Sequence, residues 1–290
     1  MSSETANTSI GSERPFMVFL RRARRNRLAR VGLVLLVIVV AAAIFGPMIT
    51  PYDPYDMDFM ARLHGPNSKH WLGTDNYGRD LLSRILAGTR ISLAVGASVM
   101  AVTTALGLVF GLIAGYYTTF DNPIMRVMDA LMAFPATLLA VAIMAALGPS
   151  TSNAVYALAI VYTPRVVRVV RSTVLTIKNA EYVQAARAQG ATDIRIVVRH
   201  ILPNCLSPLL VQETFIFAYA ILAEAGLSFV GAGAPPPTPS WGNILSEGRT
   251  YMREAPWLSV FPGLAIAATV LGLNLTGDGL RDVLDPRMKK

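Results

Sequence analysis

Long uncharged apolar segments alternate along this chain with short polar ones. The first such segment, residues 31–49, has about 19 residues, enough at 1.5 Å per residue to cross a hydrocarbon core of roughly 30 Å. Similar runs predict five further spans, at residues 91–117, 124–147, 150–170, 206–230 and 257–276. The span at 150–170 is long enough only if Arg165 and Arg168 extend their charged ends toward the interface. The pattern therefore predicts an all-α integral membrane protein with six transmembrane helices.

Basic residues predict which ends of these helices face the cytoplasm. Residues 1–30 are rich in arginine, and we expect them to form a cytoplasmic segment before the first span. Six crossings then place the tail, residues 279–290, on the same side, and residues 50–90 form a periplasmic loop with a short helix. The polar segment 171–205 is also rich in Arg and falls on the cytoplasmic side. Both termini are therefore expected in the cytoplasm.

Composition and charge support a membrane protein. Hydrophobic residues make up 53% of the chain and charged residues 15%, so a soluble bundle would lack the polar surface to cover its core. The net charge of +8 fits the topology and an attraction to anionic lipid headgroups, and we expect no nucleic-acid partner. A secretory signal peptide also begins with basic residues, but residues 31–49 exceed its usual apolar length, and Pro47 and Pro51 stand where a cleavage site is expected.

Motifs for nucleotide or hydrolytic chemistry are absent. No lysine of the chain follows a glycine, so the Gly-Lys-Ser/Thr phosphate loop is missing. The three histidines are scattered, which argues against a metal site, and the single cysteine, Cys205, has no disulfide partner. Neither a Gly-x-Ser-x-Gly nor a His-Glu-x-x-His pattern occurs. We expect no catalytic residue, metal or cofactor in this chain, so any ATP must be hydrolysed by another one.

The polar segment 171–205 holds the most informative pattern. Its apolar residues recur at steps of three and four, the period of an amphipathic helix, and Gly190 interrupts that pattern. Thr192 can cap the part that follows, and Pro203 is expected to end it. We predict two short helices outside the bilayer, joined at a glycine elbow. A single amphipathic helix lying on lipid headgroups is the alternative.

This segment resembles the cytoplasmic coupling loop of bacterial ABC importer membrane subunits. The family pattern reads Glu-Ala-Ala, three residues, Gly, nine residues, Ile, any residue, Leu-Pro. Matching it are Ala185, Ala186, Gly190, Leu202 and Pro203, whereas Gln184 replaces the Glu and His200 replaces the Ile. The resemblance implies that the segment is a coupling helix that docks on an ATPase, through Tyr182, Gln184, Ala185, Ala186, Arg187, Gly190, Leu202 and Pro203.

Residues 70–80, 236–242 and 274–282 are similar to blocks in peptide and nickel importer permeases. Their order resembles the second permease, or C subunit, of these systems, and implies a type I ABC importer permease fold with its core at residues 91–278. The resemblance also implies a multi-pass protein of the bacterial inner membrane. Its implied partners are a homologous second permease, two ABC ATPase subunits that bind ATP and Mg, and a periplasmic solute-binding protein. The expected function is an ATP-driven importer that moves a di- or oligopeptide from the binding protein across the membrane, and nickel chelate, glutathione and opine stay open as alternative cargoes.

Two carboxylates lie within predicted spans. Glu213 and Glu224 are 11 residues apart on one predicted helix, so they share a face. An unpaired carboxylate in hydrocarbon is costly, so both must face protein or water. Glu224 could line the translocation path and attract the ammonium group of a peptide, or it could pair with an Arg or a hydroxyl in the bundle. Glu213 and Asn274 are further candidates for the path.

Local features inside the spans predict how helices pack. Gly107, Gly111 and Gly115 recur every four residues, which allows close approach of another helix. Pro135 should kink the predicted span 124–147. A proton-coupled secondary transporter, with the two glutamates as proton carriers, and an intramembrane hydrolase are the alternatives to an importer subunit.

Overall fold

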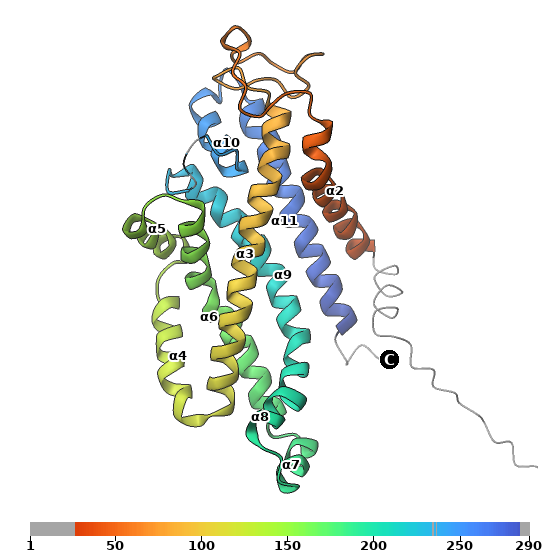
Figure 1. Ribbon diagram of the computed structural model, residues 1–290, viewed down its shortest axis with the longest axis vertical. Helices are drawn as coiled ribbons and strands as arrows, with labels where there is room; N and C mark the ends of the chain where they lie inside the picture. Colours follow the sequence, from red (N-terminus) through yellow and green to blue (C-terminus); the bar gives the residue numbers. More distant parts are fainter. Residues whose placement is uncertain (1–26, 234, 236, 285–290) are drawn as a thin grey trace, which may run out of the picture.

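The computed structural model of the chain is a bundle of long helices (Figure 1). It describes residues 27–233, 235 and 237–284, so most of the predicted basic N-terminal segment and the end of the tail lie outside it. The helices are α2 (Arg27–Ile49), α3 (Leu81–Tyr116), α4 (Thr118–Met132), α5 (Ala136–Leu147), α6 (Thr151–Ile177), α7 (Glu181–Ala188), α8 (Asp193–Ile196), α9 (Leu202–Phe229), α10 (Trp241–Gly248) and α11 (Trp257–Leu284). Two 3-10 turns (Phe59–Ala61 and Arg249–Tyr251) and one π-helical turn (Val197–Ile201) complete the described elements, which include no strand. The prediction of an all-α protein is confirmed.

Four described helices, α2, α3, α11 and the continuous segment from α8 to α9, are long and apolar enough to cross a membrane. The bent pair α4 and α5 makes a fifth if the two count as one span. α6 is 27 residues long, but it carries three arginines and is less apolar. The six-span topology and the side on which each terminus lies therefore stay predictions.

Two helix boundaries differ from those expected. The short helix expected before residue 91 is the first part of α3, which begins at Leu81 because the Asp80 carboxylate accepts a hydrogen bond from the Ser83 N–H at 2.8 Å. The expected span 124–147 breaks at Pro135 into α4 and α5, which meet at 92°. Pro135 lacks the N–H needed to continue α4, and it serves as the N-cap of α5. The predicted kink is therefore a full break.

Close packing of α3 against α6 holds the centre of the bundle together. Each of three glycines on α3 faces a valine of α6, in the pairs Gly107 with Val166, Gly111 with Val170 and Gly115 with Val174. A Cβ atom added at these glycines would lie 2.3–2.6 Å from the valine side chains, which are completely buried. Only a residue without a side chain allows this approach. The predicted glycine face is confirmed.

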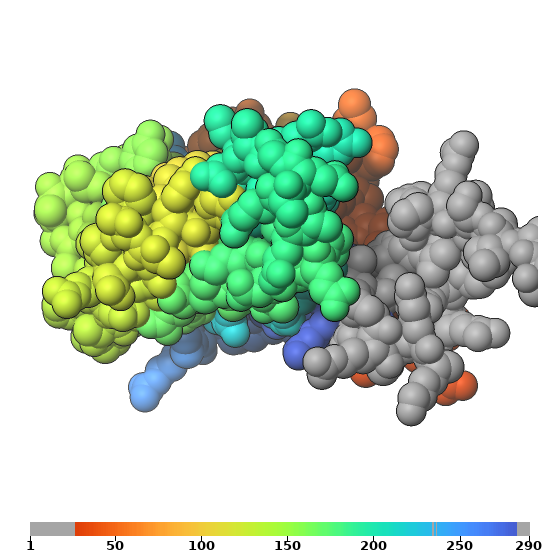
Figure 2. Space-filling model, turned by 90° about the horizontal axis from the view of Figure 1, so that it is seen from below, coloured from red at the N-terminus to blue at the C-terminus, as the bar shows by residue number. Residues whose placement is uncertain are grey.

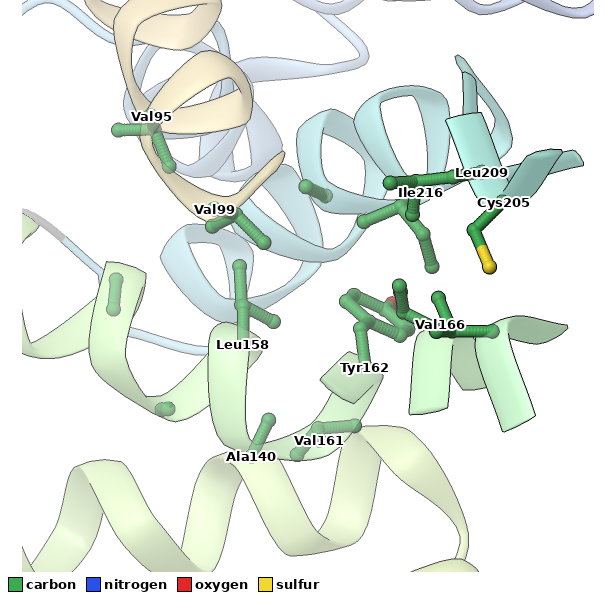
Figure 3. Close-up of a cluster of buried hydrophobic side chains, with 14 of the residues drawn as sticks. Val95, Val99, Ala140, Leu158, Val161, Tyr162, Val166, Cys205, Leu209 and Ile216 are labelled. Carbon is green, nitrogen blue, oxygen red and sulfur yellow. The ribbon is translucent and has the colours of Figure 1, made fainter. Parts of the chain in front are cut away.

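The larger hydrophobic core lies where α3, α5, α6 and α9 meet. In Figure 3, Val99 of α3 points toward Leu158 of α6, and Tyr162 of α6 lies below Ile216 of α9. A second core joins α2, α3, α9, α10 and α11 around the buried Trp241, whose indole N–H donates to the Ile85 carbonyl oxygen at 3.2 Å. This bond fixes α10 against the start of α3.

Four charged residues form a buried ionic cluster at the α10 end of the bundle. Arg79 donates to Asp75 and to Glu247, both at 2.6 Å. Arg84, which is completely buried, donates to the same two carboxylates at 2.5 Å. The cluster joins the segment before α3 to α10, and opposite charges offset the large cost of burying each ion.

Replacing Gly111 with Ala should lower the stability of the bundle. The added methyl group would overlap Val170, and forcing extra volume into a packed contact costs about 1–3 kcal/mol. Gly263→Ala on α11 is the matched control, because its added Cβ would meet nothing within 4 Å. Thermal unfolding of the two purified variants compares the costs. Equal midpoints would show that the α3–α6 contact is not tightly packed.

Candidate functional site

α7 and α8 project from one end of the bundle. Figure 2 looks at that end, where they stand out in green and teal beside the turn between α3 and α4. Several apolar side chains are exposed here: Tyr182 is 48% exposed, Val198 is 56% and Ile194 is 75%. Exposed apolar groups clustered with charged ones are typical of a surface that binds another protein.

Gly190 forms the elbow between these two helices. Its φ angle of +82° lies in the left-handed region that favours glycine. The Ala191 N–H donates to the Ala186 carbonyl at 3.1 Å, and the Gly190 N–H donates to the Arg187 carbonyl at 3.0 Å. This pair of bonds is the Schellman motif that ends helices at a glycine. Thr192 then caps α8 by accepting a bond from the Arg195 N–H, so the predicted elbow and cap are both present.

The prediction that Pro203 ends the second helix is wrong. α8 continues through the π-helical turn into α9, and Asp193–Phe229 forms one helix of 37 residues. In the π turn, the Leu202 N–H donates to the Val197 carbonyl, five residues back. Pro203 then stands in the first turn of α9, where a missing N–H is tolerated. The elbow therefore leads directly into the helix that was predicted to begin at residue 206.

The elbow is anchored to the bundle by buried side chains and by hydrogen bonds. Val183, Ile196 and Ile201 are completely buried against the larger core. The Tyr116 hydroxyl at the end of α3 donates to the Asp193 carboxylate at 2.5 Å. Arg187 donates to the same hydroxyl at 3.3 Å. Tyr116 and Asp193 were not predicted from the sequence, because their contact joins residues 77 positions apart and no local pattern signals it.

The predicted docking residues form an exposed group on α7 and at the start of α9. Exposed among them are Tyr182, Gln184, Ala185, Arg187, Gly190 and Pro203, whereas Ala186 and Leu202 are half-buried. The surface they present is accessible in the isolated chain. Their role in docking stays a prediction.

The carboxylates of Glu213 and Glu224 accept hydrogen bonds from hydroxyl groups in different parts of the fold. Glu213 is 3% exposed and accepts a bond from the Thr103 hydroxyl of α3 at 3.1 Å. Glu224 is 2% exposed and accepts bonds from the Ser228 and Ser240 hydroxyls, both at 2.9 Å. Glu224 therefore pairs with hydroxyl groups, which is one of the two kinds of partner, Arg or hydroxyl, that the sequence allowed for it. Asn274 is half-buried on α11, and a role for any of the three in the path stays a prediction.

A metal site is not evident in the part of the chain that the structure describes. Within residues 27–233, 235 and 237–284, no three His, Cys, Asp or Glu side chains group closely enough to hold an ion. Cys205 is buried and carries a free thiol. Charged groups near the elbow instead pair with one another across helices, as Arg171 and Asp121 do through two bonds of 2.6 Å.

Two family models match the sequence. The model described as binding-protein-dependent transport system inner membrane component matches residues 107–290. The model described as N-terminal TM domain of oligopeptide transport permease C matches residues 14–66.

Full-length relatives are similar over nearly the whole chain. The chain is 53% identical over 275 residues to a putative peptide transport system permease protein of Brucella abortus, covering 95% of this chain and 93% of that one. It is 47% identical over 278 residues to the dipeptide transport system permease protein DppC of Alkalihalophilus pseudofirmus, covering 95% and 91%. The glutathione transport system permease protein GsiD of Pectobacterium atrosepticum is 44% identical over 277 residues, covering 95% and 92%.

Two solved structures share the fold. The MetNI methionine ABC transporter in an inward-facing conformation has a TM-score of 0.58 at 19% identity, covering 69% of this chain and 96% of that one. An amino acid ABC transporter with histidines has a TM-score of 0.51 at 18% identity, covering 70% and 94%.

Replacing Tyr116 with Phe should loosen the elbow while the bundle keeps its stability. The change removes the hydroxyl that joins α3 to Asp193 and Arg187, and one such bond contributes about 1 kcal/mol. Hydrogen exchange of residues 181–192 should then become about fivefold faster. Tyr117→Phe is the matched control. Unchanged exchange in the Tyr116 variant would show that the hydrogen bonds do not hold the elbow.

Proposed function

The chain belongs to the family of binding-protein-dependent transport system inner membrane components, and from that premise we propose that it is the permease subunit of an ATP-driven peptide importer. It is a multi-pass protein of the bacterial inner membrane and a transport subunit rather than an enzyme. The observation that carries the peptide assignment is the identity of 53% with a peptide transport permease over 95% of the chain.

The proposal extends to the topology and partners that the sequence predicted. α6 makes the sixth span, the α7 end of the bundle faces the cytoplasm, and both termini lie there. A homologous permease packs beside this chain, and the translocation path runs between the two. Two separate ATPase subunits bind ATP and Mg, and a periplasmic binding protein delivers peptide to the α10 end. The exposed α7 residues Tyr182, Gln184, Ala185 and Arg187 support docking of an ATPase at the opposite end.

Two connections transmit movement from the docked ATPase into the membrane. The first is the continuous helix from Asp193 to Phe229, which reaches from the elbow across the bundle. The second is the bond from Tyr116 to Asp193, which joins the elbow to α3. Closing of the ATPase pair on ATP moves both coupling segments together and switches the path from inward-facing to outward-facing. Import follows when peptide released into the open path leaves toward the cytoplasm.

Glutathione is the second candidate cargo, since the chain is 44% identical to a glutathione transport permease over 277 residues. Glutathione is itself a short peptide with free carboxylates, so the two candidates differ in sequence selectivity and not in chemical class. Mass spectrometry of ligands that copurify with the cognate binding protein distinguishes them. The function itself is tested in proteoliposomes that hold the complete complex. ATP-dependent peptide uptake that needs the binding protein supports it, and uptake by this chain alone would contradict it.

Gly190→Val should uncouple ATP hydrolysis from transport. A β-branched residue at a φ of +82° is strained by at least about 1–2 kcal/mol, so the elbow should change shape. Peptide uptake should fall severalfold more than ATPase activity in the purified complex. Gly190→Asn is the control, because Asn tolerates this conformation and should keep most of the coupling. Wild-type uptake by the Val variant would contradict the coupling role.

Ala186→Trp should prevent ATPase binding. Ala186 is half-buried on α7, and the bulky ring would project from the surface that we expect to enter the ATPase groove. The transmembrane bundle should stay folded, with unchanged thermal stability. Copurification measures the loss of both ATPase subunits. Met60→Trp at the far end of the molecule, where the native side chain is 88% exposed, is the control that should retain them.

A further inference from the structure

Arg165 lies in the middle of α6 with two tyrosine rings and no carboxylate. Its guanidinium carbon is 5.2 Å from the centre of the Tyr162 ring on the same helix and 5.3 Å from the centre of the Tyr219 ring on α9. The two rings are stacked 6.4 Å apart, and the Tyr162 hydroxyl donates to the Tyr219 carbonyl at 3.5 Å. The aromatic faces orient the cation, but they leave its charge uncompensated.

The two other arginines of α6 show what Arg165 lacks. Arg168 pairs with Asp129 at 2.7 Å, and Arg171 pairs with Asp121 at 2.6 Å. Within the part of the chain that the structure describes, no Asp or Glu forms an ion pair with Arg165. Arg165 lies five residues inside the expected span 150–170, which at 1.5 Å per residue is about 7.5 Å from the cytoplasmic end of that span. An unpaired charge at that depth is costly, and such residues mark substrate pathways.

A cavity of about 410 Å³ lies against the two tyrosine rings that contact this cation. The rings of Tyr162 and Tyr219 that hold Arg165 also form part of the cavity wall. Apolar side chains from α5, α6 and α9 line most of the remainder, among them Val141, Leu158 and Leu222. The cavity is large enough for one or two amino-acid side chains, and the two tyrosine rings connect its apolar surface with the charge of Arg165.

We propose that Arg165 binds the carboxylate of the peptide in transit, while an apolar side chain of that peptide occupies the adjoining cavity. The inference rests on the proposed function, because the peptide cargo supplies the carboxylate. A peptide has one terminal carboxylate whatever its sequence, so a single arginine serves many cargoes. The tyrosine rings hold the guanidinium in place without neutralising it, so the site keeps its charge for the passing ligand.

A first experiment tests whether the site attracts anions. Leu222 lines the cavity and is 53% exposed, and the native Cys205 is buried, so Leu222→Cys places a reactive thiol at the site. In the purified complex, the rate at which a negatively charged methanethiosulfonate reagent modifies this thiol is divided by the rate for a positively charged one. That ratio should be about fivefold higher with Arg165 than in Arg165→Gln. Met60→Cys, 88% exposed in the segment before α3, is the control whose preference should not depend on Arg165.

A second experiment tests whether the ligand is a peptide carboxylate. Uptake of alanyl-phenylalanine is compared with uptake of its C-terminal amide, at concentrations that saturate the binding protein with each. Arg165→Gln should lower uptake of the free acid about tenfold more than uptake of the amide, and Arg165→Lys should retain part of the difference. Arg168→Gln, one turn along the same helix, should affect both peptides equally.

Three results would overturn the proposal. One is an equal loss of both peptides in Arg165→Gln, which would indicate a structural role. Another is loss of the second permease from the purified complex, which would indicate that a carboxylate of that partner pairs with Arg165. The third is a reagent preference at Leu222→Cys that does not depend on Arg165. If the wild-type complex imports neither peptide, the proposed function fails, and the reagent preference still reports whether Arg165 forms an anion site.

Discussion

The contact between α3 and α6 is the constraint on which the remaining arrangement depends. Valines of α6 rest directly on the backbone of α3, so the two helix axes have little freedom to separate. The last pair of this series, Gly115 with Val174, lies beside Lys178, whose ammonium group donates to the Gly115 carbonyl at 2.8 Å. Tyr116 follows immediately and reaches Asp193. A packing contact in the bundle thus determines where the elbow sits.

One helix connects the elbow with the interior of the bundle. The segment from Asp193 to Phe229 carries Asp193 at its start, Glu213 in its middle and Tyr219 in the wall of the cavity. The π turn lets it pass Pro203 without a loop. Movement at the elbow would therefore be carried as rotation or translation of a rigid element. It would stress the bonds that Glu213 accepts from Thr103 of α3 and that Glu224 accepts from Ser240, the residue that caps α10.

Features with a local cause could be predicted from the sequence, and features with a distant cause could not. The all-α class follows from the long apolar runs, and the elbow at Gly190 and the glycine face of α3 follow from backbone requirements that single residues reveal. The continuation of the helix past Pro203 escaped prediction, because the π-helical turn before it depends on where α8 is anchored. The tyrosine pair beside Arg165 also escaped prediction, since nothing in the sequence places Tyr219 next to it.

The buried ionic cluster at the α10 end has a consequence for the order in which the molecule is completed. Glu247 follows Arg84 by 163 residues along the chain. At a synthesis rate of about 5–20 residues per second, the two arginines emerge roughly 10 to 30 seconds before their second carboxylate exists. During that interval, Asp75 is the one carboxylate of the cluster that is available to Arg79 and Arg84. The buried cluster at this end is therefore completed only late in synthesis, once α10 has been made.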